Sequence, residues 1–318
     1  MIAAKISKAV ALFLILSAAA PTGGIGASAA QTGATAAQTY ASANEAVTAL
    51  VDALRADKRD ALRTVLGPGS DKLLSSGDKY SDAEERQKFL AAYDEQNELV
   101  SAAPNRMVLQ VGKDKWPLPI PIVEASGRWH FDSQGGAQEL VDRRIGRNEI
   151  AAIRTALAYV DAQKEFFVFT GQNDQAQYAQ RLVSSPGKYD GLYWPTEEGK
   201  PESPLEPLVA QAREEGYPID QSATGPRPYH GYYFRILTGQ GANTPDGARD
   251  YISNGRMAGG FALIASPAIY GASGIMSFIV NQDGIVFQKD SGPQSAAIAS
   301  TMKIFDPDLS WAKVEVVN

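Results

Sequence analysis

Short apolar runs, broken by glycine and proline, dominate the last third of the chain. They cover residues 232–237, 261–266, 275–280 and 285–288 and contain many aromatic and β-branched residues, which favour half-buried strands. Residues 281–284, Asn-Gln-Asp-Gly, have the composition of a tight reversal, because glycine adopts positive φ at little cost. The pattern predicts an antiparallel meander in which runs adjacent in sequence pair in the sheet.

A helical pattern precedes this meander over residues 148–167. Apolar side chains recur there at spacings of three and four residues, so they share one side of a helix that is expected to lie across the sheet. Asn148 is a candidate N-cap, and the polar run 143–147 before it marks an expected domain boundary. The apolar stripe consists of Ile150, Ile153, Leu157, Val160 and Phe167.

Other segments have weaker patterns. Residues 178–183 and 205–215 are predicted to form helices, residues 291–300 a loop, and residues 311–317 a last strand.

In residues 42–145, helical patterns come first and strand patterns second. Ser42 followed by Glu45 has the spacing of a capping box at the start of a helix. Two more helical patterns follow, one ending near residue 66 and one over 82–98, and then strand patterns at 107–111, 116–123 and 128–132. The sequence therefore predicts an α+β protein with two domains, 42–145 and 146–318.

Residues 1–30 have the composition of a secretory signal peptide. Lys5 and Lys8 precede an apolar run over 10–20, which is shorter than the roughly 20 residues that a membrane-spanning helix needs. Ala27-Ser28-Ala29 is a small-residue cleavage site, so cleavage is expected near Ala29 or Ala30. An uncleaved membrane anchor is the alternative. Residues 31–41, rich in Ala, Thr and Gln, are expected to form a flexible N-terminus, and the mature chain is expected to be periplasmic or secreted, without a membrane span.

Charge and cysteine content exclude several classes of function. The formal net charge is −6, which argues against a nucleic-acid partner because binding the phosphate backbone needs a basic surface. The chain has no cysteine, so it has no thiol nucleophile, no disulfide and no cysteine to carry a lipid. Its two histidines lie a hundred residues apart, a poor basis for a zinc site.

No motif for an established chemistry is present. The chain lacks the G-x-S-x-G elbow, the Walker loop and the dinucleotide fingerprint, so no catalytic residue, no metal and no cofactor is assigned. Asn281 with Asp283, and Asn173 with Asp174, are candidate calcium ligands, but a plain turn is the more common role of such residues.

Two groups of residues are candidates for a binding site. His230 begins a predicted strand beside Tyr232 and Arg235, and these three side chains are able to line a pocket. Asp190 precedes Tyr193 and Trp194 in a predicted loop, which forms a recognition patch if it is exposed or a lid over the sheet if it is buried. The large area of the two aromatic side chains favours burial. A cleft joining both groups is the arrangement to look for.

Several long motifs resemble one protein family. They are LLSSGD, WPLPIPIVEASGRWHFD, GRNEIAAIRTALAYVDAQKEFF, YAQRLVSSPGKYDGLYWP, PYHGYYFRIL and YGASGIMSFIVNQDGIVFQKD. In this order they resemble DUF2950, a family of uncharacterised bacterial proteins, across nearly the whole mature chain. The resemblance implies no particular activity.

Two fainter resemblances concern the fold. The helices and the Gly-Arg-Trp-x-Phe-Asp strand within 42–145 are similar to the cone-shaped domains related to nuclear transport factor two, which are either pocket enzymes or inert modules. No Asp/His pair is placed as the enzymes require, so the inert version is favoured. The helix and meander of the second half are similar to the globular part of type IV pilins and pseudopilins, although the helix here carries no hydrophobic assembly segment.

These observations lead to one preferred function and two alternatives. We expect an exported protein of the cell envelope that binds or scaffolds without catalysis, with an envelope protein or a glycan as its partner. The first alternative is an envelope hydrolase that uses carboxylates and tyrosines. The second is a pilin-like structural subunit.

Overall fold

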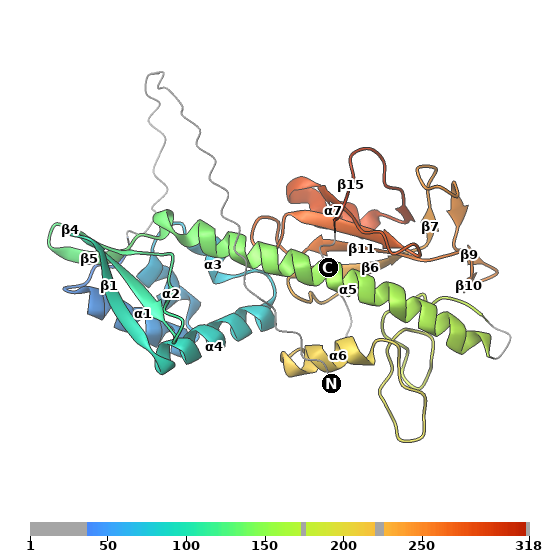
Figure 1. Cartoon of the computed structure of the whole chain (residues 1–318), viewed down its shortest axis with the longest axis horizontal. Coiled ribbons are helices and arrows are strands. Elements are labelled where there is room, and N and C mark those ends of the chain that lie inside the picture. Colours follow the sequence, from blue (N-terminus) through green and yellow to red (C-terminus); the bar gives the residue numbers. More distant parts are fainter. Residues whose placement is uncertain (1–36, 173–175, 220–225, 316–318) are drawn as a thin grey trace, which may run out of the picture. The chain divides into compact units, whose positions relative to one another are not determined.

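The computed structural model describes residues 37–172, 176–219 and 226–315. The predicted signal peptide, residues 31–36 of the predicted flexible N-terminus, and the candidate calcium ligands Asn173 and Asp174 lie outside these ranges. Helices and mainly antiparallel sheets make up the described residues, so the predicted α+β class is confirmed (Figure 1). In this part of the chain, no helix combines the length and the apolar character that crossing a bilayer requires.

Four helices open the fold. They are α1 (Ala43–Arg55), α2 (Arg59–Leu66), α3 (Asp71–Leu74) and α4 (Lys79–Glu95). Ser42 caps α1 by accepting the Glu45 N–H, as predicted, while the Glu45 carboxylate accepts the N–H of Ala41, one residue earlier than in a regular capping box. The α4 helix starts and ends three residues earlier than the predicted 82–98.

The first sheet is antiparallel throughout. Its strands are β1 (Asn97–Ala103), β2 (Arg106–Val111), β3 (Trp116–Pro117), β4 (Ile122–Ala125) and β5 (Arg128–Phe131), in the order β1-β2-β4-β5 with β3 also paired to β2. The β1 strand was not predicted from the sequence. Its Leu99 and Val100 pair with Leu109 and Val108 across the hairpin. This pairing, rather than local propensity, makes the segment a strand.

A first hydrophobic core lies between this sheet and the helices before it. Val47, Leu50 and Val51 of α1 pack with buried residues of the sheet, among them Leu109, Ile122 and Phe131. Burial of apolar surface at about 25 cal/mol per Å² is the main source of stability here, because the chain has no cysteine for disulfides.

The α5 helix (Ala137–Gly171) is 35 residues long and contains the predicted helix 148–167. Ala137 belongs to the first core, whereas Ala152, Tyr159 and Val160 belong to a second core. Ile150 is 52% exposed, so the buried side of the helix lies slightly away from the predicted stripe. The predicted domain boundary between residues 145 and 146 falls inside α5, and the division into two domains at that point stays a prediction.

The second sheet is the predicted meander with one added edge strand. Its strands are β6 (Tyr232–Leu237), β11 (Ala262–Pro267), β12 (Met276–Asn281), β13 (Phe287–Asp290) and β15 (Ala312–Lys313), all antiparallel, in the order β15-β13-β12-β11-β6. Asn281 accepts the N–H of Gly284, which has φ +73, and this closes the predicted reversal between β12 and β13.

Helices cover both faces of this sheet (Figure 1). Val160 of α5 packs with Phe278 and Leu263 in the second core. The opposite face carries α7 (Ser295–Thr301), which follows the turn η2 (Gly292–Gln294). The predicted loop at 291–300 is therefore wrong: the short run Ser-Ala-Ala-Ile-Ala-Ser-Thr forms a helix where buried Ala299 joins the second core.

Shorter elements complete the fold, one before α5 and the others in the second half. They are η1 (Ser133–Gly135), α6 (Glu206–Glu214), β7 (Gly239–Gln240), β8 (Arg249–Asp250), β9 (Ile252–Ser253), β10 (Arg256–Met257) and β14 (Ile304–Phe305). The α6 helix agrees with the prediction for 205–215. Residues 178–183 form no helix, because Tyr178 bridges to Met257 and Val183 bridges to Tyr193.

Because three tyrosines are buried, we predict that the folded state becomes less stable at alkaline pH. Burial raises the pKa of Tyr159, Tyr232 and Tyr251, the last from 10.0 to about 12. A raised pKa means that the folded state holds the proton more tightly than the unfolded state, so the stabilisation is complete below pH 10 and is lost as pH rises through about 12. In this pH window the free energy of unfolding falls as pH rises. We expect the slope of that fall to be smaller in Tyr251→Phe than in the unchanged protein, by about 1 kcal/mol per pH unit.

Urea denaturation at several alkaline pH values measures this slope. Tyr189→Phe, which removes a phenol from a side chain that is 43% exposed, is the control and should keep the slope of the unchanged protein. Equal slopes in the Tyr251→Phe variant and the unchanged protein would contradict the prediction.

Candidate functional site

Asp78 is a fully buried carboxylate at the start of α4. Its Oδ1 accepts the N–H groups of Tyr80 and Ser81, at 3.2 and 3.3 Å, and so caps the helix. Its Oδ2 accepts the Tyr217 hydroxyl at 2.8 Å and the Gly231 N–H at 3.0 Å. Four donors and the positive end of the helix dipole therefore compensate a charge that is costly to bury alone.

Tyr217 connects Asp78 to the strand that His230 precedes. Its hydroxyl donates to Asp78 and accepts the backbone N–H of His230 at 3.1 Å. Burial, reinforced by the charge of Asp78, raises the pKa of Tyr217 above its usual range, so the phenol remains a donor at neutral pH. His230 itself has φ +46, a left-handed conformation that is unusual for a residue with a side chain.

The His230 imidazole lies beside a carboxylate and two aromatic rings. Its Nε2 is 3.1 Å from Oε2 of Glu215, and its ring centre is 4.2 Å from that of Tyr229. Burial first, and the charge of Glu215 second, raise the pKa of Tyr229. The side chains of His230 and Glu215 are 20% and 16% exposed, although Oε2 of Glu215, the atom nearest the imidazole, is itself buried.

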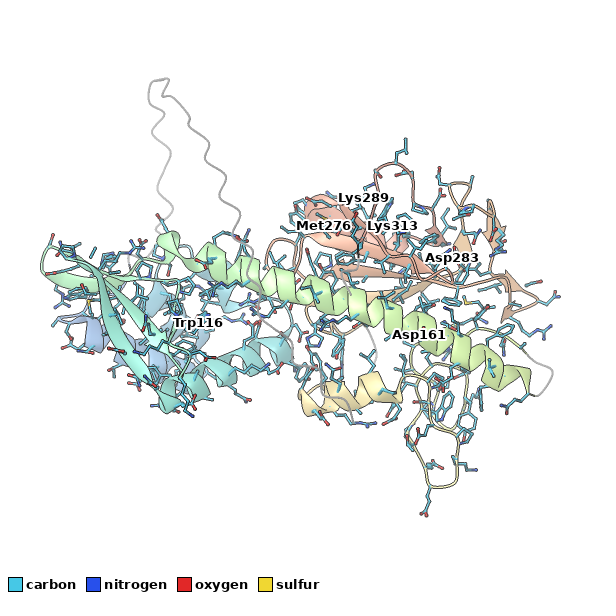
Figure 2. All side chains as sticks on the ribbon, viewed as in Figure 1. Trp116, Asp161, Met276, Asp283, Lys289 and Lys313 are labelled. Carbon is cyan, nitrogen blue, oxygen red and sulfur yellow. The ribbon has the colours of Figure 1, made fainter. Side chains whose placement is uncertain are left out.

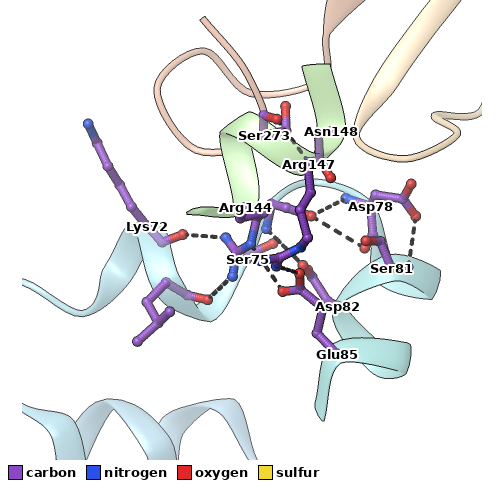
Figure 3. Close-up of polar contacts among 12 residues, drawn as sticks. Lys72, Ser75, Asp78, Ser81, Asp82, Glu85, Arg144, Arg147, Asn148 and Ser273 are labelled. Atoms are coloured by element: carbon purple, nitrogen blue, oxygen red, sulfur yellow. Dashed lines mark hydrogen bonds and ion pairs between the residues drawn. The ribbon is translucent and has the colours of Figure 1, made fainter. Parts of the chain in front are cut away.

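Gly231 occupies a position that admits no side chain. Its φ is +73, and a Cβ there would lie 2.6 Å from Nδ2 of Asn148 and 2.9 Å from Cβ of Ser273. Asn148 donates from Nδ2 to the carbonyl of Ser273 at 2.9 Å (Figure 3). The prediction that Asn148 is an N-cap is therefore wrong. Asn148 is an interior residue of α5, and its side chain binds the loop before β12.

We call this group of side chains and backbone sites the polar junction. It consists of Asp78, Asn148, Glu215, Tyr217, Tyr229, His230, Gly231 and Ser273.

Arg144 makes a second set of contacts next to the polar junction. Its guanidinium is almost fully buried and donates to the carbonyls of Lys72 and Leu73, at 2.9 and 2.7 Å (Figure 3). Glu85 pairs with both Arg144 and Arg147. The basic run that was predicted as a domain boundary thus belongs to a helix and binds α3 and α4.

Glu149 and Asp82 bind backbone in the same region. Oε1 of Glu149 accepts the N–H groups of Ile275 and Met276, both at 3.0 Å. Both oxygens of Asp82 accept the Ser76 N–H, and burial raises the pKa of Asp82 against the opposing effect of Ser76 and Arg144. These contacts fasten loops to helices and leave the carboxylates in fixed positions.

The chemistry open to the polar junction is limited. Asp78 already has its donors, and the two tyrosines remain protonated at neutral pH, so none of them is prepared to act as a nucleophile or a base. The Glu215–His230 pair is the part that combines titratable groups with exposure to water. No group of three or more His, Asp or Glu side chains in the described ranges is able to hold a metal ion.

Tyr193 and Trp194 are buried, as their area predicts. Nε1 of Trp194 donates to the Pro201 carbonyl at 2.8 Å, and its ring lies 5.4 Å from that of Phe169. Asp190 accepts hydrogen bonds from the N–H and the hydroxyl of Ser185. Burial raises the pKa of the Asp190 carboxyl, but these hydrogen bonds act against burial and the pKa is lowered. The loop therefore covers the end of α5 rather than presenting its aromatic rings.

Tyr232 and Arg235 also bind within the fold. The Tyr232 hydroxyl donates to the Met276 carbonyl at 2.9 Å, and Arg235 donates to the carbonyls of Ala299 and Met302 at the end of α7. The α6 segment lies between the two predicted groups, since Arg213 donates to the Tyr193 hydroxyl and Glu215 pairs with His230. A binding role for the six residues stays a prediction.

Of the eight members of the polar junction, His230 alone was predicted from the sequence as a site residue. Asp78 ends the LLSSGD motif, which was a usable signal. Glu215 and Tyr217 lie in a segment without a motif, and only the long-range contacts identify them.

One comparison with known proteins is informative. The model of a family described as "Protein of unknown function (DUF2950)" matches residues 37–314. No curated protein and no solved structure matches the chain. The resemblances to cone-shaped domains and to pilins therefore stay predictions.

We predict that Asp78→Ala lowers the free energy of unfolding by about 2–4 kcal/mol. The substitution removes a helix cap and leaves the Tyr217 hydroxyl and the Gly231 N–H buried without an acceptor. Chemical denaturation measures the change. Asp52→Ala removes an exposed carboxylate of α1 and is the control, with an expected change within about 0.5 kcal/mol. Equal effects of the two substitutions would show that the polar junction does not stabilise the fold.

Proposed function

The chain belongs to the DUF2950 family, and from its own contacts we propose that it is an exported, non-catalytic protein of the cell envelope that binds or scaffolds a partner. The observation that carries this proposal is the set of contacts that the motif residues make. LLSSGD, GRNE, PYHGYY and YGASG supply most of the polar junction, and their polar groups bond one another. Motifs used in this way build a rigid framework instead of a reactive centre.

Export rests on the composition of residues 1–30, which combine two lysines, an apolar run and an A-x-A site. Export normally permits disulfides, but the chain has no cysteine, so its stability comes from apolar burial. An envelope protein or a glycan is the proposed partner.

The second candidate is an envelope hydrolase, and the Glu215–His230 pair favours it. An imidazole 3.1 Å from a partly exposed carboxylate has the geometry of a general base with an orienting group. The left-handed backbone of His230 adds to this case, since strained residues cluster at functional sites.

A substrate screen separates the two functions. We expect purified mature protein to turn over no ester, peptide or glycan substrate in a way that depends on His230 or Glu215. Turnover that disappears in both His230→Ala and Glu215→Gln variants, with native circular dichroism in each, would establish the hydrolase instead.

Binding and export need a separate measurement. We expect the chain, expressed with residues 1–30, to be recovered outside the cytosol with a mass that corresponds to cleavage near Ala29 or Ala30. The mature protein is expected to bind either purified cell-wall glycan or a crosslinked periplasmic protein in a saturable manner. Full-length protein retained in the cytosol, or no saturable binding to either preparation, would contradict the proposal.

A further inference from the structure

A groove of about 440 Å³ lies on the α7 side of the second sheet, and none of its lining residues belongs to the polar junction. Its volume is within the range of ligand sites, about 300–1,000 Å³. The apolar side chains that line the groove come from β12, from α7 and from the residues that follow α7, including β14. They are Ile279, Ile298, Met302, Ile304 and Trp311. Ile298 and Ile304 are 43% and 46% exposed, so this apolar surface is open to a ligand.

Charged side chains at the groove are mostly acidic. Asp290, Asp306 and Asp308 face a single cation, Lys289 (Figure 2), which leaves a formal charge of −2. None of the three carboxylates forms an ion pair with a basic side chain of the described residues. Asp306 accepts the Asn243 N–H and Asp308 accepts the Ser310 N–H, each through Oδ1, so Oδ2 of both remains able to accept.

Trp311 is oriented to receive a cation. Nζ of Lys289 lies 5.8 Å from the centre of its ring, and the same ammonium donates to Ser310 at 2.8 Å. An indole face attracts ammonium groups by its quadrupole. The groove therefore contains both an aromatic and a carboxylate environment for positive charge.

A buried hydroxyl under the groove lacks a partner. Ser277 is 2% exposed and makes no hydrogen bond to any described residue. It precedes Ile279 by two residues on β12 and pairs with Lys289 on β13, so its side chain is on the face of the sheet that forms the groove. Buried polar groups almost always have a partner, and this hydroxyl lies on the groove face of the sheet without one.

We propose that this groove binds a linear aliphatic polyamine, a ligand beyond the protein or glycan partner proposed above. The methylene chain covers the isoleucine and methionine side chains, while the ammonium groups contact Trp311 and the free oxygens of Asp306 and Asp308. An anionic ligand would be repelled by the carboxylates. A bare metal ion would leave the apolar surface uncovered.

Titration calorimetry with spermidine at low ionic strength tests the proposal. We expect saturable binding of one spermidine per chain. Two matched probes separate the contributions: octane-1,8-diol has the chain without charge, and Mg²⁺ has charge without the chain. Neither is expected to compete with spermidine at equal concentration, and full competition by Mg²⁺ would reduce the groove to a patch of general negative charge and overturn the proposal.

Variants locate the binding site. The double substitution Asp306→Asn and Asp308→Asn is expected to weaken spermidine binding by about tenfold or more, since it removes two ionic partners. Asp52→Asn with Asp161→Asn changes the net charge equally on exposed positions of α1 and α5 and should weaken binding less than about twofold (Figure 2). Equal weakening in the two double variants would contradict a site at the groove.

Two further arms complete the test. Ile298→Lys adds a positive charge at an exposed groove position and is expected to abolish binding without loss of the native circular dichroism. A trilysine peptide that binds through Asp306 and Asp308 where spermidine does not would replace the polyamine by a basic peptide and overturn the proposal. Failure of the polyamine would leave the export and substrate-screen results of the proposed function unaffected, so the two hypotheses fail separately.

Discussion

The carboxylate of Asp78 is the contact on which the other polar contacts depend. It lies 139 residues from Tyr217 and 153 residues from Gly231 in the chain, yet it accepts a hydrogen bond from each. The same carboxylate caps α4. A buried charge with four donors restricts geometry strongly, because the loss of any one donor leaves a charge partly unsatisfied in a medium of low dielectric constant. The positions of α4, Tyr217 and the start of β6 are therefore coupled.

Around this carboxylate, the long helix α5 supplies polar side chains at successive positions. Arg144 binds backbone carbonyls before α4, Asn148 binds the carbonyl of Ser273, and Glu149 binds two N–H groups at the start of β12. Further along, the same helix buries Tyr159 and Val160 against the meander. One helix thus provides hydrogen bonds to loops with one segment and apolar packing with the next.

The two functional hypotheses use different surfaces for a physical reason. In the polar junction, the polar groups are already paired within the chain, so a ligand gains little there. At the groove, three carboxylates face one cation, Lys289, without forming an ion pair within the described residues, and apolar side chains are open to solvent. Surfaces with unmet charge and exposed apolar area are the ones that gain free energy from a ligand. The Glu215–His230 pair is intermediate, since it is internally paired but still partly exposed.

The sequence by itself determined the α+β class, the meander and the main helices, because strand alternation, helical spacing and turn residues are local features that do not depend on the rest of the fold. It also indicated that Tyr193 and Trp194 are buried. Tertiary structure alone decided that β1 is a strand, that residues 291–300 contain a helix, and that Asn148 is an interior anchor rather than a cap. Each depends on a partner outside the segment itself: Leu109 for Leu99, the β11 strand for α7, and Ser273 for Asn148. The polar junction belongs to this second group, since nothing in the spacing of Asp78, Tyr217 and Gly231 along the chain shows that they meet.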